Sequence, residues 1–176
     1  MKRIKQFVTM MICFSLLMSF PGYASTLEWE NVPGNHYESV ILPPNVLNSK
    51  NAYRTVARGD FLSAGAVEIG NLQNGSLKIN IDTYAHHNVD SIFHTVFLDQ
   101  WDEDDQDWYQ VGRWDFTVDK EEVENQQLSE LLTIFTVTGY ETGKYYRLRG
   151  LHGVEYNDEI EATATETNGV LLTDRS

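Results

Sequence analysis

From Phe61 onward, apolar and polar residues alternate, and this period of two constrains the fold more than any other feature of the chain. The pattern is clearest over Ser76–Ala85, where Leu77, Ile79 and Ile81 are separated by polar residues. Successive side chains of a β-strand point to opposite faces, so the alternation indicates strands that each bury one face. An amphipathic helix would instead need apolar residues three and four positions apart. The sequence therefore predicts an all-β fold.

Turn residues divide this region into short segments. The expected strands are Gly65–Leu72, Ser76–Ala85, Ser91–Trp101, Asp107–Val118, Leu131–Thr138, Lys144–Val154, Glu159–Thr165 and, as a marginal case, Val170–Leu172. Seven to eight short antiparallel strands without long helical segments are typical of a β-sandwich. We expect a single antiparallel β-sandwich of immunoglobulin-like or related Greek-key topology.

Two connections carry more specific signals. The dipeptide Asn74-Gly75 favours a type I′ turn and predicts a hairpin between the strands on either side of it. Asp119 and Glu122 have the spacing of a capping box, which predicts a short helical turn within residues 119–127. We expect this turn to cross from one sheet to the other.

The segment Lys144–Val154 is expected to be a central strand. Its alternation places Tyr146, Leu148 and His152 toward the interior, with Tyr145 on the opposite face. In Greek-key sandwiches, a tyrosine near the start of such a strand often caps a corner by a hydrogen bond to backbone upstream. Tyr146 is in the position for that role.

Residues 1–24 have the pattern of a secretory signal peptide. Three basic residues within the first five precede the apolar run Phe7–Phe20, and the small residues Gly22 and Ala24 follow. The run is shorter than the roughly 20 residues that a transmembrane helix needs. We expect cleavage after Ala24 and a secreted, extracellular protein without a membrane anchor. The chain then divides into a signal peptide (1–24), an N-terminal arm (25–56) and a β-sandwich domain (57–173).

The charge of the mature chain excludes two classes of partner. Cleavage would leave 10 Lys and Arg against 26 Asp and Glu, a formal charge of −16. Nucleic acids and anionic membranes bind proteins mainly through neutralised phosphates, so neither is expected as a partner. Cys13, the only cysteine, lies in the apolar run and is lost with it. Because small eukaryotic extracellular domains usually depend on disulfides, we expect a bacterial protein.

The arm, residues 25–56, differs from the rest of the chain. Three prolines interrupt any strand pairing, yet Trp29 and several aliphatic residues make the segment too apolar for a disordered tail. In the expected strand Ser91–Trp101 both faces are apolar, with Phe93 and Phe97 on one of them. We expect the arm to lie across these two phenylalanines. The alternative is that they belong to a partner-binding surface.

Four motifs resemble a known family of small secreted proteins from Gram-positive, clostridia-type bacteria. They are an R-G-x-[YF]-L-x-x-G start at Arg58–Gly65, Trp108 with Trp114 in a tryptophan-rich hairpin, a [YF]-Y-R-[VL]-x-G-x-H strand at Tyr145–His152, and a T-N-G segment at Thr167–Gly169. The family, DUF6147, is one of unknown function. The resemblance covers about residues 57–172 and leaves the arm outside it. It implies a secreted β-sandwich and supplies no catalytic residues.

An acidic run is the first candidate site. The carboxylates that could bind a cation are Asp99, Asp102, Asp104, Asp105 and Asp107. Calcium takes six to eight oxygen ligands, and one loop with this many carboxylates could supply several of them. The run lacks the central glycine of an EF-type loop, however, and a hairpin tip is where solvated charges usually lie. A solvated tip is therefore the expectation, and calcium binding is the alternative. No other cofactor is expected.

The aromatic residues are the second candidate. By period two, Trp108, Trp114 and Phe116 share one face and are expected in the core. Trp101 and Tyr109 are the pair expected to be exposed, where they could stack on sugar rings.

The histidines do not predict a zinc site. Adjacent His86 and His87 would face opposite ways on a strand, and His94 and His152 are expected to point inward as buried, hydrogen-bonded side chains.

No sequence feature indicates catalysis. The chain contains no nucleophile-elbow motif, no His-Glu-x-x-His and no phosphate-binding glycine loop. We therefore expect a secreted, non-enzymatic β-sandwich module that acts as an extracellular interaction or surface-associated protein, with a protein or a glycan as partner. The alternative is a glycan-binding module that uses Trp101 and Tyr109. A hydrolase with a carboxylate pair is a third hypothesis, although so acidic a chain contains many such pairs by chance.

Overall fold

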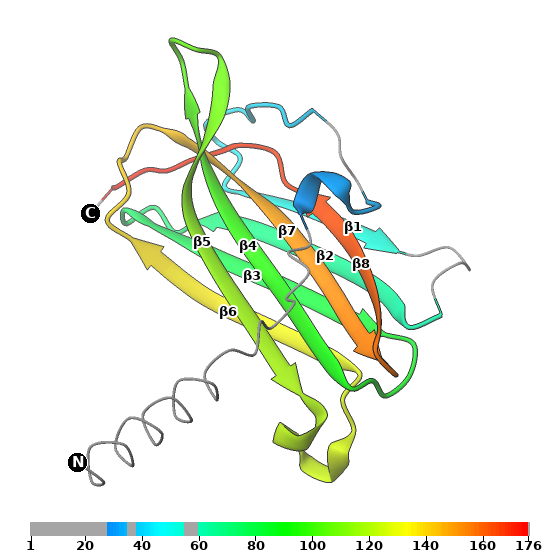
Figure 1. Ribbon diagram of the computed structural model, residues 1–176. Coiled ribbons are helices and arrows are strands. Elements are labelled where there is room, and N and C mark those ends of the chain that lie inside the picture. The colour runs from blue at the N-terminus through cyan, green and yellow to red at the C-terminus, as the bar shows by residue number, and fades with distance from the viewer. Residues whose placement is uncertain (1–27, 35–37, 55–59, 176) are drawn as a thin grey trace, which may run out of the picture.

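The computed structural model describes residues 28–34, 38–54 and 60–175, and it shows two antiparallel sheets packed face to face (Figure 1). The strands are β1 (Asn48–Arg54), β2 (Leu62–Asn71), β3 (Ser76–Ala85), β4 (Ser91–Asp102), β5 (Asp107–Asp119), β6 (Glu130–Thr138), β7 (Tyr145–Tyr156), β8 (Glu159–Glu166) and β9 (Val170–Leu171). One sheet has the order β1-β2-β3-β6, and the other has the order β5-β4-β7-β8, with β9 pairing with β7. The predicted all-β sandwich is confirmed.

The strand β1 was not expected. It lies in the segment that the sequence analysis assigns to the arm, and it pairs with β2 from Asn48↔Gly70 to Arg54↔Ala64. Its alternation is hard to recognise because the less exposed positions are Ser49, Asn51 and Tyr53. At the edge of a sheet, such a strand covers less of the core than a central strand, and its sequence is correspondingly polar.

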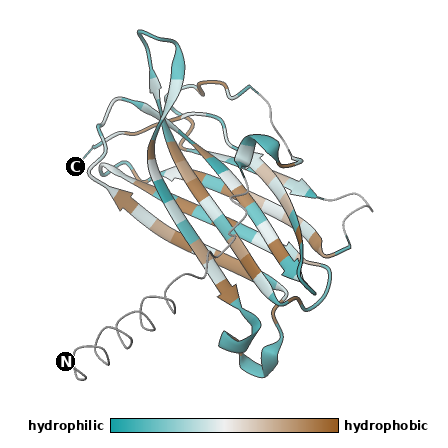
Figure 2. Cartoon of the chain, viewed as in Figure 1, coloured by the Kyte–Doolittle hydropathy of each residue, from teal (hydrophilic) through white to brown (hydrophobic). Residues whose placement is uncertain are grey.

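The core lies between the sheets in two clusters. Apolar positions alternate with polar ones along the strands in Figure 2, as the period of two predicts. The larger cluster contains Val67, Ile69, Leu77, Ile79, Ile81, Val96, Leu98, Val137, Tyr146, Leu148, Val170 and Leu172. The smaller one contains Leu62, Val89, Ile92, Leu128 and Val154 at the other end. This burial is the main source of stability, because the chain has no disulfide in the described part.

Two predicted connections have different outcomes. The capping box of Asp119 and Glu122 is present, and it begins two short 3₁₀ helices, η2 (Lys120–Glu122) and η3 (Glu124–Gln126), between β5 and β6. The hairpin between β2 and β3 is confirmed, but its predicted type I′ turn at Asn74-Gly75 is wrong, since positive φ angles occur at Gln73 and Gly75. The reason is tertiary: Asn74 forms a bridge with Asp174, and the N–H of Gly75 donates to the carbonyl of Thr173.

The predicted register of β7 and the role of Tyr146 are confirmed. Tyr146 is fully buried, and its hydroxyl donates to the carbonyl oxygen of Glu141 at 2.9 Å, five residues upstream. The same hydroxyl lies 2.9 Å from Oε1 of Gln100. Leu148 and His152 also point inward and are fully buried.

A bulge in the β4–β5 hairpin changes the expected faces of the tryptophans. The register shifts between Leu98↔Gly112 and Asp99↔Gln110, so that β5 contains one extra residue. An extra residue reverses the alternation beyond it. Trp108 therefore does not share the inward face of Trp114, and its placement in the core is wrong.

The arm lies along the β8 edge of the second sheet. Gly34 and Ile41 form parallel bridges with Ala164 and Gly169. A Cβ atom at Gly34 would lie 2.2 Å from the carbonyl oxygen of Ala164, so this approach requires glycine. The 3₁₀ helix η1 (Trp29–Asn31) lies in front of β7 and β8 in Figure 1. The expected signal peptide, residues 1–24, lies outside the described residues. Within the described ranges, no helix has the length and apolar character needed to cross a bilayer.

Candidate functional site

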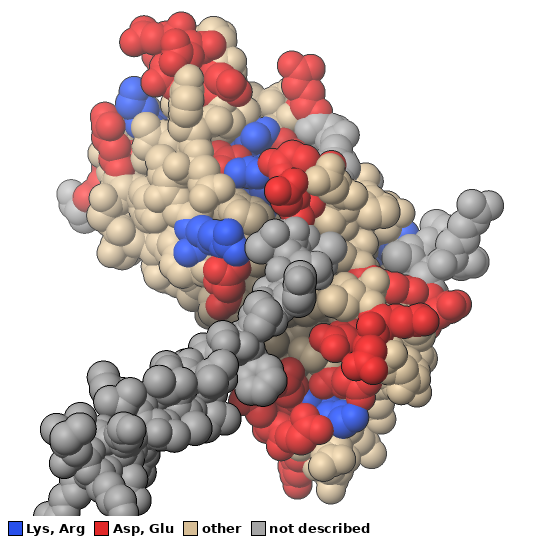
Figure 3. Space-filling model, viewed as in Figure 1, with Lys and Arg blue, Asp and Glu red and all other residues tan. Residues whose placement is uncertain are grey.

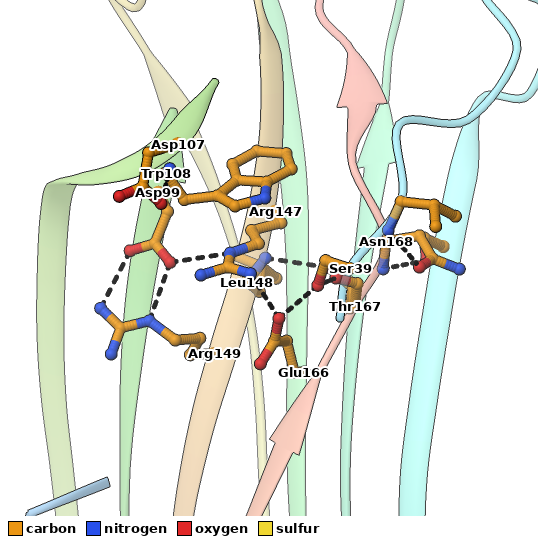
Figure 4. A network of polar contacts seen from close by, with 12 residues as sticks. Ser39, Asp99, Asp107, Trp108, Arg147, Leu148, Arg149, Glu166, Thr167 and Asn168 are labelled. Atoms are coloured by element: carbon orange, nitrogen blue, oxygen red, sulfur yellow. Dashed lines mark hydrogen bonds and ion pairs between the residues drawn. The ribbon is translucent and has the colours of Figure 1, made fainter. Parts of the chain in front are cut away.

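A cluster of buried charges lies on the outer face of the second sheet (Figure 4). Asp99 on β4 is only 1% exposed. Its Oδ2 accepts from Nε of Arg147 at 3.0 Å and from Nε of Arg149 at 2.8 Å, and its Oδ1 accepts from Nη2 of Arg149 at 3.0 Å. Glu166 on β8, also buried, accepts hydrogen bonds from Arg147 and from the hydroxyl of Ser39. We call Asp99, Arg147, Arg149 and Glu166 the arginine cluster.

Aromatic rings enclose the two guanidinium groups. Arg149 lies between the rings of Trp29 and Phe97, with its Cζ atom 5.2 Å and 4.9 Å from their centroids. Arg147 lies 4.8 Å from the ring of Trp108. The expected cover by the arm is seen at Phe97, where Arg149 lies close to both this ring and Trp29; at Phe93 it stays a prediction. The ring of Phe93 packs against the backbone of Gly153, and a Cβ atom added at Gly153 would lie 2.1 Å from Cζ of Phe93.

The chemistry of the arginine cluster is structural. Burial raises the pKa of Glu166, although the hydrogen bond from Ser39 and the charge of Arg147 oppose that effect. For Arg149, burial alone would lower the pKa, but the hydrogen bond and charge of Asp99 raise it overall. Because each carboxylate is already satisfied by arginines, the cluster has no open position for a ligand. It fastens the arm to the sheet.

The acidic candidates are not brought together as a metal site. Asp99 accepts hydrogen bonds from Arg147 and Arg149 and belongs to the arginine cluster. Asp102, Asp104, Asp105 and Asp107 lie at the tip of the β4–β5 hairpin, where acidic side chains gather at the top of the view in Figure 3. Within residues 28–34, 38–54 and 60–175, no group of three or more potential ligands is placed to hold a metal ion.

Hydrogen bonds within the tip occupy several of these oxygens. Oδ1 of Asp102 accepts from the backbone N–H groups of Asp104 and Asp105 at 2.8 and 3.1 Å. These bonds lower the pKa of Asp102. The hydroxyl of Tyr109 donates to Oδ2 of Asp105 at 2.7 Å, which raises the pKa of Tyr109 to about 12.

Trp101 and Tyr109 do not form one platform. Residues directly opposite in an antiparallel pair share a face. Trp101 is opposite Trp108, with ring centroids 5.2 Å apart, whereas Tyr109 is opposite Gln100. The two predicted sugar-stacking residues therefore point to opposite sides of the hairpin. Tyr109 is 47% exposed, and Trp101 is partly covered.

A hydrogen-bonded chain of threonines and histidines crosses the core. Oγ1 of Thr83 lies 3.2 Å from Nδ1 of His94 and 3.0 Å from Nδ1 of His152. The Nε2 atoms of these histidines lie 2.8 Å from Oγ1 of Thr133 and Thr165, respectively. A hydroxyl has one proton, so Thr83 cannot donate to both imidazoles, and at least one of them carries its proton on Nδ1.

These histidines are neutral and closed to solvent. Burial lowers the pKa of His94 to about 4. Burial, with the nearby His94, lowers the pKa of His152 to about 3. The expectation of inward, hydrogen-bonded histidines is confirmed, and these two are part of the packing between the sheets.

A groove on the outer face of the first sheet was missed by the sequence analysis. It has a volume of about 550 Å³ and is formed by the end of β1, the start of β2 and the end of β3. Its lining residues are Lys50, Ala52, Arg54, Ser63, Ala64, Gly65, Ala66, Asp82, Tyr84 and Ala85. Ser63 is the extra residue of a bulge between β2 and β3.

The register explains why the face is hollow there. One row across three strands is Ala52, Ala66 and Asp82, and the next row is Arg54, Ala64 and Tyr84. Three alanines thus form a low floor, with longer side chains around it. One feature of the sequence could have indicated the groove. Ala64 and Ala66 are small residues on the solvent face of a strand, where polar residues normally lie.

The walls of the groove differ in charge. Lys50 and Arg54 are exposed on β1, and neither forms an ion pair within the described part of the chain. Asp82 and Tyr84 stand on β3. Burial raises the pKa of Asp82, and the charges of Glu68 and Glu130 add to this effect while Lys50 opposes it. Burial and the charge of Asp82 raise the pKa of Tyr84.

The comparison with protein families extends the expected resemblance. The DUF6147 family, a family of unknown function, matches residues 45–170. The match begins before residue 57, where the resemblance was expected to start, and so includes β1. No curated protein matches the chain. Because the match covers most of its length, the chain belongs to the DUF6147 family.

Proposed function

We propose that this protein is an exported, non-enzymatic binding module that takes a polar ligand in the groove of the β1–β2–β3 face. The observation that carries the proposal is the groove itself, with its floor of alanines and its two cations, Lys50 and Arg54, which form no ion pair with a described residue. Its volume of about 550 Å³ is within the range of about 300–1,000 Å³ that is usual for small-ligand sites. The arginine cluster and the histidine chain, by contrast, have no open position.

The side chains around the groove favour binding over catalysis. Of the described residues that line it, Asp82 is the single carboxylate, and none is a histidine or cysteine. A glycosidase needs two carboxyl groups on either side of the scissile bond. General acid–base or nucleophilic catalysis likewise needs a base positioned beside the reacting group. This groove supplies hydrogen-bonding groups and charge without such a pair.

Export is supported by the pattern of residues 1–24, with basic residues, an apolar run and small residues before position 25. N-terminal sequencing of the protein from culture supernatant should find Ser25 as the first residue. Recovery of the chain only from cells, with Met1 in place, would contradict export.

The alternative glycan site at Trp101 and Tyr109 has weaker support. Those rings lie on opposite sides of the hairpin, so at most one of them could stack on a given sugar. Calcium at the acidic tip also has weaker support, since Oδ1 of Asp102 and Oδ2 of Asp105 already accept hydrogen bonds from within the tip.

Filling the groove tests the proposal. In Ala66→Leu and Ala64→Phe, a larger side chain would occupy the floor without entering the core. Thr117→Phe, on an exposed position of β5 in the other sheet, is the matched control. On arrays of glycans and peptides, the wild type and Thr117→Phe should bind the same ligands, and the groove variants should lose them while melting at similar temperatures. Ligands that remain bound to both folded groove variants would refute the groove as the site.

A further inference from the structure

The charge of the groove and its place in the sheet indicate the class of ligand. Lys50 and Arg54 flank Ala52 on the same face of β1, two residues away on either side. Each lies about 6–7 Å from Ala52 along the strand, so the backbones of Lys50 and Arg54 are about 13 Å apart. Their long side chains can therefore converge on one anion above the methyl group of Ala52.

Cations are scarce in this chain, and two of them line the groove. The whole sequence has 13 Lys and Arg against 26 Asp and Glu. Four cations on the second sheet and beside it are paired: Arg113, Lys120, Arg147 and Arg149. Lys50 and Arg54 form no ion pair with a described residue, and the same is true of Lys78, Lys144 and Arg175. Glu68 lies directly opposite Lys50 on β2. What distinguishes Lys50 and Arg54 is that both line the groove. A carboxylate on the ligand would complement them.

The position of the groove argues against an extended peptide. Peptides that bind sheets usually add a strand at an edge, where free backbone groups form hydrogen bonds. Here the floor is β2, whose backbone is paired with β1 on one side and β3 on the other. The ligand must therefore be recognised through side chains alone, so it must carry many polar groups on a compact, partly apolar frame. A sugar ring has this composition.

The remaining residues fit such a ring. The methyl groups of Ala64 and Ala66 offer an apolar floor for its C–H groups. The ring of Tyr84 stands at the side opposite Arg54, across one intervening strand. Neighbouring strands are about 4.8 Å apart, so the backbones that carry these two side chains are roughly 10 Å apart. Asp82 can exchange hydrogen bonds with sugar hydroxyls.

We infer that the groove binds an acidic saccharide, with the sugar carboxylate held by Lys50 and Arg54 and the ring lying on Ala64 and Ala66 beside Tyr84. This inference rests on the proposed function of the groove and specifies its ligand. Acidic peptides and neutral sugars are the competing ligands that an experiment must separate.

The probes are polygalacturonate, alginate and hyaluronan, each compared with its carboxyl-reduced counterpart, in which the carboxylates have become alcohols. Poly-glutamate serves as the acidic peptide. The variants are Lys50→Gln and Arg54→Gln, singly and together. Lys78→Gln is the matched control, because Lys78 lies on the same face of β3 outside the groove.

At least one acidic polysaccharide should bind the wild type and Lys78→Gln about equally. Carboxyl reduction, or the double variant, should weaken this binding at least about tenfold, the loss expected for a charge-assisted hydrogen bond worth about 1.5 kcal/mol or more. Added salt should weaken it as well.

Three results would overturn the inference. If the acidic and the carboxyl-reduced polymers bind equally well and Ala66→Leu abolishes the binding of both, the groove binds neutral sugars and the proposed function remains intact. Equal or tighter binding of poly-glutamate would show a peptide site. If no polysaccharide binds, the inference of an acidic saccharide is wrong. The array experiment with Ala66→Leu and Ala64→Phe then tests separately whether the groove binds any other ligand.

Discussion

His94 and His152 lie directly opposite each other on β4 and β7, and both contact the hydroxyl of Thr83 on the facing sheet. One hydroxyl thus joins the two sheets at the centre of the sandwich. Gly65 and Gly150, which belong to the family-like motifs, make room for His152. A Cβ atom at Gly65 would lie 2.5 Å from the His152 ring, and one at Gly150 would lie 3.0 Å from Nε2 of His152.

The histidine pair should make the stability of the fold depend on pH. Both pKa values are lowered by burial, to about 4 for His94 and about 3 for His152, from 6.5 for an unburied imidazole. The unfolded state therefore binds more protons below pH 6.5, and the stabilising contribution is complete above that pH and is lost as the pH falls toward 4.

Urea unfolding of the wild type and of His94→Gln between pH 7 and pH 4 measures this effect. The wild-type free energy of unfolding should fall more steeply with acid than that of the variant. For one histidine, the slopes of unfolding free energy against pH can differ between the two proteins by at most about 1.4 kcal/mol per pH unit. Parallel curves for the two proteins would mean that His94 is not held neutral by the fold.

Asp99→Asn should be strongly destabilising. It leaves the buried guanidinium groups of Arg147 and Arg149 without their shared carboxylate, and breaking a buried pair costs about 3–5 kcal/mol. Asp115→Asn is the control, because Asp115 pairs with Arg113 at the surface, with both side chains 57% exposed. Exposed pairs are worth about 0–1 kcal/mol. Similar losses of unfolding free energy in the two variants would contradict the structural role of the arginine cluster.

The close approach at Gly65 predicts a contrast between two glycines on one strand. Gly65→Ala would push a Cβ atom into the ring of His152, which is fully buried, and should cost about 1–3 kcal/mol. At Gly70, the nearest atom to an added Cβ is Lys78 Cβ at 3.9 Å. Gly70→Ala should be neutral or stabilising by up to about 1 kcal/mol, since glycine weakens a strand. Thermal melts of both variants check this, and a tolerated Gly65→Ala would show that His152 is not tightly packed there.

The strand alternation could be predicted, and several further features could not. Ser76–Ala85 was predicted with its observed bounds because its faces differ clearly in polarity. The strand β1 was not predicted because an edge strand need not bury large apolar residues. Trp108 was misplaced because a bulge reverses the alternation, and a bulge leaves no mark in a pattern of apolar residues.

The candidate groove could not be predicted for a related reason. Its floor is made by alanines from two strands that are adjacent only after β1 and β2 have paired. Asp99 was assigned to the acidic run because it is close to that run in the sequence. Its partners Arg147 and Arg149 lie some fifty residues away and could not be recognised from spacing. Such sites depend on contacts between distant segments, which composition and spacing do not reveal.

Tyr146 provides a test of the corner and of the β7 register. Tyr146→Ala removes a fully buried ring and the hydrogen bond to the carbonyl of Glu141, and it should cost about 3–5 kcal/mol. Tyr145→Ala should cost clearly less, because Tyr145 faces the other side and is partly exposed. Urea melts of the two variants that show equal losses would contradict the register.

Alanine methyl groups can report directly on ligand binding in the groove. Ala52, Ala64 and Ala66 line the groove, whereas Ala162 and Ala164 lie on β8 in the other sheet. The protein is labelled at its alanine methyl groups and titrated with the tightest-binding member of the arrays while NMR spectra are recorded. The signals of Ala52, Ala64 and Ala66 should shift, and those of Ala162 and Ala164 should not. Unchanged groove signals at a concentration where the ligand is bound would contradict binding in the groove.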